Sequence, residues 1–238
     1  MNIRDIAASG EGNGSDMSIN SRSGDVKFKL SVRQQPEAAR ACGFGDLDRR
    51  TIDPPPIIQL NVQGPDFSES DIESHLRYPG YVMQCFIRDE SGCLDVSSMP
   101  QENWHQKRSK NKRLLGQDVS TPFFGEDDLG HEGCFFYFDD LSCRTTGNFK
   151  LHFCLTRVGE RDAKDGQHIP HLAEVQSDVF TVYTAKEFPG MQASTGLARS
   201  LKRHGCVITI RKDPDRSKNT GEKNSTSDEE PDDDEGDM

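Results

Sequence analysis

Alternating apolar and polar residues are the clearest pattern along this chain. Every second residue is apolar in VKFKLSV, residues 26–32, and NFKLHFCLTRV, residues 148–158, places Phe149, Leu151 and Phe153 on one side. Side chains of a β-strand point alternately to its two faces, so a period of two indicates a strand with one face against a core. Both segments are therefore predicted to be half-buried strands.

Shorter apolar runs, separated by connections rich in glycine and proline, predict further strands. These candidates are residues 57–62, 81–88, 114–119, 134–141, 174–185 and 206–212. Many short strands with few helices are typical of two antiparallel sheets packed face to face. We therefore expect an all-β fold, an immunoglobulin-like antiparallel β-sandwich with one or two short helices.

One segment, STGLARSLKRHG, has the features of a helix. The hydroxyl of Ser194 or Thr195 can cap its amino end, and Leu197 and Leu201 are four residues apart, as on one helical face. Basic residues in its last turn complement the helix dipole, and Gly205 can end it. A short basic helix is predicted here.

Composition divides the chain into a folded centre and two polar ends. Residues 1–25 are rich in Gly, Ser, Asn and Asp without an apolar period, which predicts a disordered lead-in to a domain at 26–212. Within that domain, residues from about 89 to 112 are expected to form a long loop.

An acidic tail, 213–238, follows the domain and is predicted to be disordered. Its last fifteen residues carry eight acids and no base, so the net charge of -11 becomes -3 without them. Acidity of the whole chain therefore does not exclude a polyanionic partner, and the tail either solvates the protein or competes with nucleic acid at a basic surface.

Enzyme motifs and membrane signals are missing from the sequence. It has no G-x-S-x-G, no G-x-x-x-x-G-K-[ST], no G-x-G-x-x-G between a strand and a helix, and no H-E-x-x-H. A Cys/His pair that meets in space stays open as an alternative, but we expect no enzyme and no cofactor. No signal peptide is evident and no apolar run approaches the roughly 18 residues of a membrane span. Seven cysteines without a C-x-x-C pair indicate free thiols in a reducing compartment.

Histidines and cysteines cluster in one part of the chain, which raises the question of zinc. The residues concerned are His131, Cys134, Cys143, His152 and Cys154. Structural zinc sites generally present their ligands as two close pairs, and this spacing does not. Apolar neighbours surround Cys134, Cys143, Cys154 and Cys206, as is typical of small buried core residues. The sequence therefore favours core cysteines, and no metal ligand is predicted.

Three basic segments, residues 33–50, 104–113 and 199–218, interrupt the acidic chain and contain the candidate binding residues. In the first, RQQPEAARACGFGDLDRR, glycines allow sharp turns and arginines can form paired hydrogen bonds with phosphates and guanine edges. If the three segments share one face, they would form a phosphate-binding surface. The candidate DNA contacts are Arg33, Arg40, Arg49, Arg50, Lys107, Arg108, Lys110, Lys112, Arg113, Lys202 and Arg203.

Each basic segment also has a less specific interpretation. KRSKNKR is either a nuclear-import or phosphate-contact patch or a stretch that maintains solubility. In the first segment, Asp46, Asp48 and Asp53 could pair with the arginines and fix the loop without any ligand. Composition does not decide between these alternatives.

Four long segments, in this order, resemble the velvet family of fungal regulators. They are RQQPEAARACGFGDLDRRTIDPPPIIQL, RYPGYVMQCFI, GCFFYFDDLSCRTTGNFKLHFCL and SDVFTVYTAKEFPGMQASTGLARSLKRHGCVITIRK. The resemblance spans about Val26 to Lys212, and the CGFG and SCRTTGNF versions are most similar to the VelC branch.

The resemblance implies a sandwich similar to the Rel-homology domains of NF-κB-type factors. It implies binding to double-stranded promoter DNA as a homodimer, or as a heterodimer with other velvet proteins, and residence in the nucleus with shuttling from the cytoplasm. The processes it implies are fungal development, sporulation and secondary metabolism. The rival interpretation is a dimerisation module that modulates DNA-binding partners and has little DNA affinity of its own.

Within the first basic segment, Arg49 and Arg50 match two basic positions that contact DNA in the family. Gly45 and Leu47 stand where the spore-viability branch has lysines. With fewer positive charges, the resemblance implies weaker DNA binding or the need for a partner subunit.

Overall fold

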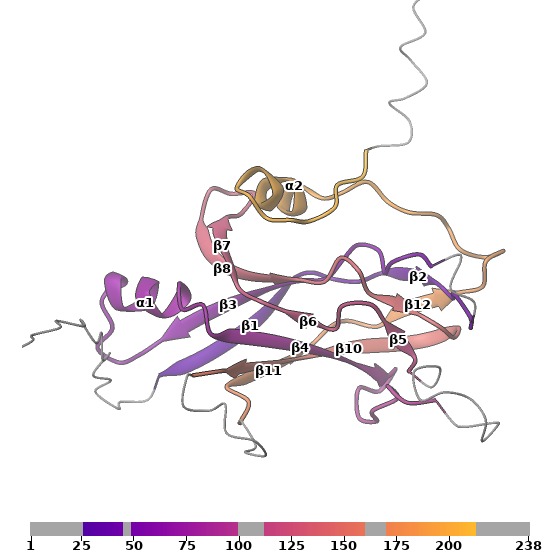
Figure 1. The fold of residues 1–238 in the computed structure, drawn as a ribbon, viewed down its shortest axis with the longest axis horizontal. Helices are drawn as coiled ribbons and strands as arrows, with labels where there is room; N and C mark the ends of the chain where they lie inside the picture. Colours follow the sequence, from indigo (N-terminus) through magenta and orange to yellow (C-terminus); the bar gives the residue numbers. More distant parts are fainter. Residues whose placement is uncertain (1–25, 45–48, 100–111, 160–169, 213–238) are drawn as a thin grey trace, which may run out of the picture.

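Two β-sheets face each other across a shared core, as Figure 1 shows. The computed structural model describes residues 26–44, 49–99, 112–159 and 170–212. The predicted disordered ends and the centre of the predicted long loop lie outside these ranges. An all-β sandwich is confirmed, whereas the likeness to Rel-homology domains stays a prediction.

The smaller main sheet has four strands, all paired antiparallel. Its order is β1 (Lys27–Gln34), β3 (Ile57–Gln63), β8 (Glu132–Tyr137) and β7 (Phe123–Glu126). Leu30 pairs with Leu60, which pairs in turn with Cys134, so the apolar positions of three strands align in one row. This row forms one wall of the core.

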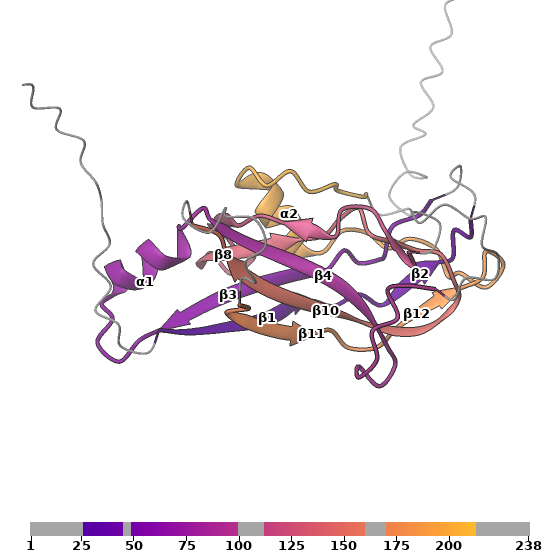
Figure 2. The same ribbon diagram turned by 60° about the horizontal axis from the view of Figure 1, so that its bottom comes forward.

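The larger sheet is built around the longest described strand, β10. Its order is β2 (Ala38–Arg40), β12 (Phe180–Tyr183), β10 (Gly147–Arg157), β4 (Tyr81–Asp89) and β6 (Val119–Ser120), and β11 (Ala173–Gln176) also pairs with β10. Figure 2 shows β11 beside β10. All pairings are antiparallel except that of β2 with β12, which is parallel and departs from the predicted all-antiparallel arrangement. The chain thus leaves β1 in the smaller sheet and enters the larger sheet at its edge, through β2.

Three small elements complete the described fold. Strands β5 (Leu114–Leu115) and β9 (Ser142–Cys143) form a two-stranded sheet, and the helices are α1 (Glu69–Leu76) and α2 (Gly196–Arg203). Thr195 caps α2 by accepting a hydrogen bond from Ala198 N, and Leu197 and Leu201 are buried, as predicted. Each helix has eight residues, and no helix in the described part of the chain is long and apolar enough to cross a membrane.

Strand β8 is apolar on both faces because it is covered on both. Phe136 points into the core between the sheets, whereas Phe135 packs in a second cluster with Leu201 of α2 and with Ile208 beyond it. A continuous apolar run is expected where both faces of a strand are buried. The helix and the segment after it therefore form a third layer over the smaller sheet.

Two predicted strands need correction. Residues 206–212 form no strand in the structure, although Cys206 and Ile208 are buried and Val207 is exposed, which gives the expected alternation. Thr209 N donates to the Asp139 carboxylate and Arg211 N to Ser194 Oγ, so these backbone groups bond to side chains and not to a neighbouring strand. The predicted strand 114–119 is instead split into β5 and β6, because Gly116 between them has a φ of 100°.

The remaining differences concern strand limits and elements that the sequence pattern did not predict. The predicted strand 174–185 is divided into β11 and β12 at Ser177, which hydrogen-bonds with the backbone of Leu151. Strands β2, β7 and β9 and helix α1 were not predicted. Helix α1 did carry a signal, since Ser68 and Asp71 form a reciprocal capping box at its start.

The four cysteines predicted to lie in the core are all buried, and all seven cysteines are free thiols. Burial raises the pKa of Cys134 to about 12 and that of Cys143 to about 11. These two thiols are therefore protonated at neutral pH and behave as small apolar side chains.

Phe153→Ala tests the core assignment. Because the Phe153 ring is fully buried and packs 5.2 Å from the ring of Phe138, its removal leaves a cavity. We expect the free energy of unfolding to fall by about 3–5 kcal/mol. Leu129→Ala, at a side chain that is 71% exposed, is the control and should change it by less than about 0.5 kcal/mol. Urea denaturation measures both, and equal effects would contradict the assignment.

Candidate nucleic-acid interface

A buried arginine joins two of the three basic segments. Arg144 follows β9, and its side chain donates to the carbonyl oxygens of Lys112 (3.1 Å) and Gly43 (2.9 Å). Its backbone accepts from Gly43 N and donates to the carbonyl of Arg113. The arginine-rich segment and the end of the long loop are therefore side by side, although they are about 70 residues apart in sequence.

Arg49, at the end of the arginine-rich segment, is held against the same small sheet. Its Nε donates to Ser142 Oγ at 2.9 Å, and its Nη2 donates to the carbonyl of Asp140 at 2.7 Å. Nη2 also forms an ion pair with the Asp140 carboxylate, and the Arg49 side chain remains 32% exposed. Gly116 allows this close approach, because a Cβ at that position would collide with the Asp140 carbonyl. Arg50 beside it is exposed.

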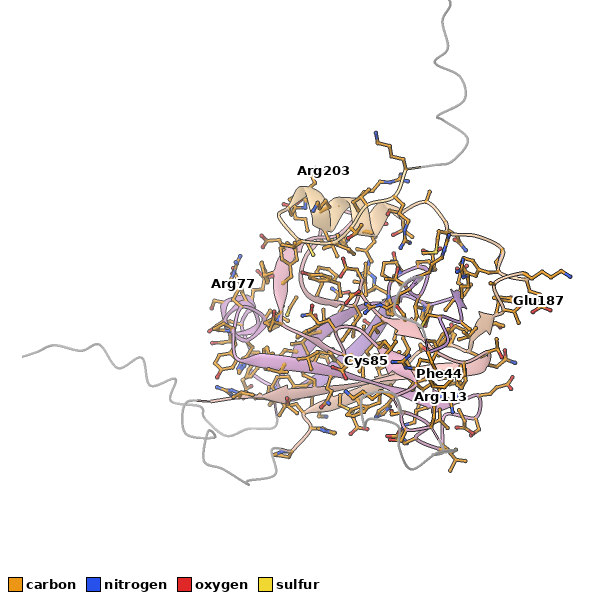
Figure 3. All side chains as sticks on the ribbon, turned by 45° about the vertical axis from the view of Figure 1, so that its right-hand side comes forward. Phe44, Arg77, Cys85, Arg113, Glu187 and Arg203 are labelled. Carbon is orange, nitrogen blue, oxygen red and sulfur yellow. The ribbon has the colours of Figure 1, made fainter. Side chains whose placement is uncertain are left out.

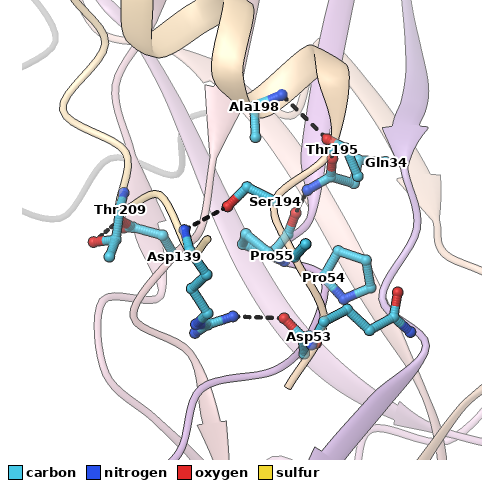
Figure 4. Close-up of a pocket in the computed structure, with 12 residues that line it drawn as sticks. Gln34, Asp53, Pro54, Pro55, Asp139, Ser194, Thr195, Ala198 and Thr209 are labelled. Atoms are coloured by element: carbon cyan, nitrogen blue, oxygen red, sulfur yellow. Dashed lines mark hydrogen bonds and ion pairs between the residues drawn. The ribbon is translucent and has the colours of Figure 1, made fainter. Parts of the chain in front are cut away.

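Asp53, one of the three acids that could pair with the arginines of the first segment, has a partner from the third segment. Asp53 is buried, and its partner is Arg211, whose Nη1 lies 2.6 Å from Asp53 Oδ1 and whose Nη2 donates to Thr51. Figure 4 shows Asp53 in a narrow pocket beside the proline run, with a dashed line that marks this ion pair. Asp46 and Asp48 lie outside the described residues. Among the described residues, Asp140 is the acid that holds Arg49.

Two arginines of the first segment are part of the fold. Arg33 lies in β1, 27% exposed, and donates to Gln59 and, at 3.1 Å, to Asp127. Arg40 lies in β2, partly buried, in register with Tyr183 of β12. The predicted loop is therefore partly strand at these positions.

The second segment is described only at its end. Lys112 is exposed and lies 3.5 Å from Asp118, whereas Arg113 donates to the carbonyl of Val96 and stacks over the ring of Phe149. Predicted contacts outside the described residues are Lys107, Arg108 and Lys110. Arg113 therefore anchors the base of the long loop.

The third segment is divided between two places. Lys202 and Arg203 are exposed on α2, and Figure 3 shows Arg203 well away from Arg113 and Phe44. Arg211, farther along, reaches the end of the arginine-rich segment through Asp53 and Thr51. The structure therefore brings the first two basic segments and Arg211 together. Lys202 and Arg203 on α2 lie apart from this group.

The residues that organise this surface were not predicted from the sequence. Arg144 and Asp140 flank the SC pair of β9, and nothing in their spacing shows that they meet residues 43 and 49. Arg211 lies within the third basic segment but is not among the candidate contacts. Their roles depend on tertiary pairing, which single-sequence patterns do not contain.

The sequence matches the velvet factor family over residues 28–112 and 95–214. It is 53% identical to the sexual development regulator velC of Gibberella moniliformis over 98% of this chain and 49% of that protein. It is 54% identical to the spore development regulator vosA of Beauveria bassiana over 84% of this chain and 71% of that protein. A more distant relative, 32% identical over 79% of this chain and 76% of that protein, is the developmental and secondary metabolism regulator MVE1 of Zymoseptoria tritici. The chain thus spans about half the length of its velC relative.

Asp127, which holds Arg33, gives a pH-dependent test of that contact. Burial alone would raise the pKa of the Asp127 carboxyl, but hydrogen bonds from the backbone of His131 and Leu129 and from Arg33 outweigh burial and lower it. A lowered pKa means that the carboxylate stabilises the fold above its unfolded pKa, near 3.8, and that this stability disappears as the pH falls through the folded value.

Asp127→Ala is therefore expected to lower the free energy of unfolding at neutral pH by about 1–3 kcal/mol, since two backbone N–H groups lose their acceptor. The difference between the two proteins should shrink as the pH falls below the ordinary carboxyl range. Urea unfolding at a series of pH values measures this. A difference that stays constant with pH would show that the carboxylate charge is not involved.

Proposed function

This chain belongs to the velvet factor family, and from that membership we propose that it is a sequence-specific DNA-binding regulator of fungal development. The relatives named above are regulators of sexual development, of spore development, and of development with secondary metabolism. We propose the same processes here, with double-stranded promoter DNA as the ligand and the nucleus, entered from the cytoplasm, as the site of action.

The observation that supports DNA binding best is the joining of basic segments by Arg144. Lys112 and the exposed Arg50 lie in the two segments that it connects, and Arg49 packs on the adjacent β9. Clustered guanidinium and ammonium groups on a rigid sheet end can replace the counterions of a phosphate backbone. Their affinity for DNA then depends on salt and on the number of phosphates contacted.

The ion pair with Asp140 gives Arg49 a particular role. A carboxylate acceptor orients the guanidinium but also competes with phosphate for the same donors. We therefore propose that Arg49 exchanges Asp140 for a DNA phosphate on binding, and that the affinity of a single chain is modest. A partner subunit, either a second copy or another velvet protein, would add the contacts that a single chain lacks.

A second candidate function is a dimerisation module that acts through DNA-binding partners. The observation that favours it is the same pairing of Arg49 with Asp140, because a neutralised arginine contributes less to a positive surface. The absence of lysine at positions 45 and 47 also favours the dimerisation module. On this alternative, the partner protein supplies the DNA contacts.

The double variant Arg49→Ala, Arg50→Ala tests DNA contact against a charge-matched control, Lys202→Ala, Arg203→Ala on α2. If the two arginines contact phosphates, we expect the first variant to weaken binding to every duplex and to reduce the salt slope by about 0.9 for each phosphate that is no longer bound. If they contact bases, discrimination between duplexes should fall by about 1–3 kcal/mol for each paired hydrogen bond to a base. Mobility-shift titrations at two salt concentrations measure both quantities, and thermal melting checks the fold.

The same titrations, repeated with a velvet partner present, separate the two functions. Unchanged DNA affinity of the pair after neutralisation of Arg49 and Arg50 would favour the dimerisation module. Equal reductions in the arginine variant and in the α2 control would contradict the placing of the interface. No binding by the single chain or by the pair would reject DNA binding altogether.

Asp140→Asn tests the proposed exchange directly. It removes one negative charge beside Arg49 while the backbone carbonyl still accepts from Nη2. Since an exposed ion pair is worth about 0.2–1 kcal/mol, DNA affinity should rise by up to about fivefold. Glu187→Asn, at an exposed acid elsewhere on the surface, is the control. Lower affinity in Asp140→Asn would show that the carboxylate orients Arg49 for DNA and does not compete.

A further inference from the structure

Three metal-binding side chains meet on one face of the larger sheet. His152 and Cys154 are two residues apart in β10 and so point to the same face, and Glu174 of β11 is the direct cross-strand neighbour of Cys154. Ligand atoms of the three residues all lie within 4.8 Å of one another. The pairing of β10 with β11 therefore assembles a nitrogen, a sulfur and an oxygen at one point.

The spacing fits a tetrahedral ion. His152 Nε2 lies 3.2 Å from Glu174 Oε2. Nitrogen and oxygen ligands about 2.0–2.1 Å from a zinc ion at a tetrahedral centre are about 3.4 Å apart, so these two atoms lie close to the required separation. The Cys154 sulfur lies within 4.8 Å of the other ligand atoms, and a zinc–sulfur bond of about 2.3 Å would require it to be close to both of them.

Two of the three side chains are buried and the third is exposed, so an ion could enter the site from the exposed side. His152 is 6% exposed and Cys154 is 2% exposed, whereas the Glu174 side chain is 48% exposed. Among the described residues, no group hydrogen-bonds with the buried Nδ1 of His152. Nε2, the nitrogen that faces Glu174, is the one that could coordinate an ion, and the proton of the neutral imidazole would then be on Nδ1.

Neighbouring groups orient the carboxylate and balance the charge. His171 Nδ1 lies 2.7 Å from Glu174 Oε1, the oxygen that does not face His152, and this contact fixes the orientation of the carboxylate. Histidine contacts of this kind are typical of residues that support metal ligands. Arg88 is the nearby cation, but it donates to the carbonyl of Cys93 and is partly compensated by Asp95.

We propose that His152, Cys154 and Glu174 form a binding site for a zinc-class divalent cation, with a water molecule in the fourth position. Three protein ligands of mixed type with one open position suit zinc or cobalt and not magnesium or calcium, which take oxygen ligands. The ion would fasten β11, which pairs with β10 over four residues, to the centre of the larger sheet.

Protonation states are compatible with this site. Burial and then Arg88 lower the pKa of His152, which leaves its imidazole neutral and able to donate a lone pair. Burial raises the pKa of Cys154 to about 11, so the thiol proton must leave to solvent as the metal–sulfur bond forms. Metal affinity is therefore expected to rise with pH.

The test is cobalt and zinc titration of the full chain after chelator treatment. We expect one Co²⁺ per chain, with a thiolate-to-cobalt charge-transfer absorption that Zn²⁺ removes by displacement. Cys154→Ser should abolish that absorption, and Glu174→Gln should weaken Zn²⁺ binding by about 10- to 100-fold or more. The matched controls are Cys93→Ser, at an exposed thiol, and Glu187→Gln, at an exposed carboxylate; both should bind as the unchanged chain does.

Thermal melting provides a second readout that does not depend on the buried cysteine. Zn²⁺ should raise the melting temperature of the unchanged chain and of both controls, and should raise that of Glu174→Gln less, because this variant binds Zn²⁺ more weakly. Because Glu174 is half exposed, this variant is expected to fold. A charge-transfer absorption that is missing from the unchanged chain, or that persists in Cys154→Ser, would overturn the proposal. An equal rise in melting temperature in Glu174→Gln would also overturn it.

Discussion

Burial of β8 on both faces is the constraint on which the rest of the structure depends. Phe136 needs the larger sheet on one side, and Phe135 needs α2 and the segment around Ile208 on the other. An apolar strand covered on one side would expose large aromatic rings to water. Packing against Phe135 therefore brings the carboxyl-terminal segment back across the smaller sheet, and this return carries Arg211 to Asp53.

The same constraint determines how the charged residues are distributed. Arg33, Arg144 and Arg211 are used inside the fold, where they bind Asp127, backbone carbonyls and Asp53. Each of these arginines joins segments that are distant in sequence. Some of the arginines that make this chain a candidate nucleic-acid binder therefore stabilise the fold. Fewer positive charges are available to a ligand than the sequence suggests.

Much of the fold could be predicted from the sequence, because its strands alternate and its main helix is capped. The period of two located β1 and β10, and the capping hydroxyl with Leu197 and Leu201 located α2. Residues 206–212 show the limit of such patterns, since alternating burial there comes without a strand partner. The sequence pattern does not show which distant segment each strand contacts in the folded chain.

The candidate sites were less predictable for the same reason. Spacing placed Arg49 and Arg50 in one segment but gave no sign of Asp140, which comes from a connection about 90 residues later. Likewise, His152 and Cys154 belong to the cluster of five histidines and cysteines for which no metal ligand was predicted, and Glu174 joins them only through strand register. Short strands at the edges of the larger sheet, β2 with three residues, β6 with two and β11 with four, have a further consequence. They offer few unpaired backbone groups, so two such sheets have little scope to merge into one, and association of chains through these edges would have to use side chains.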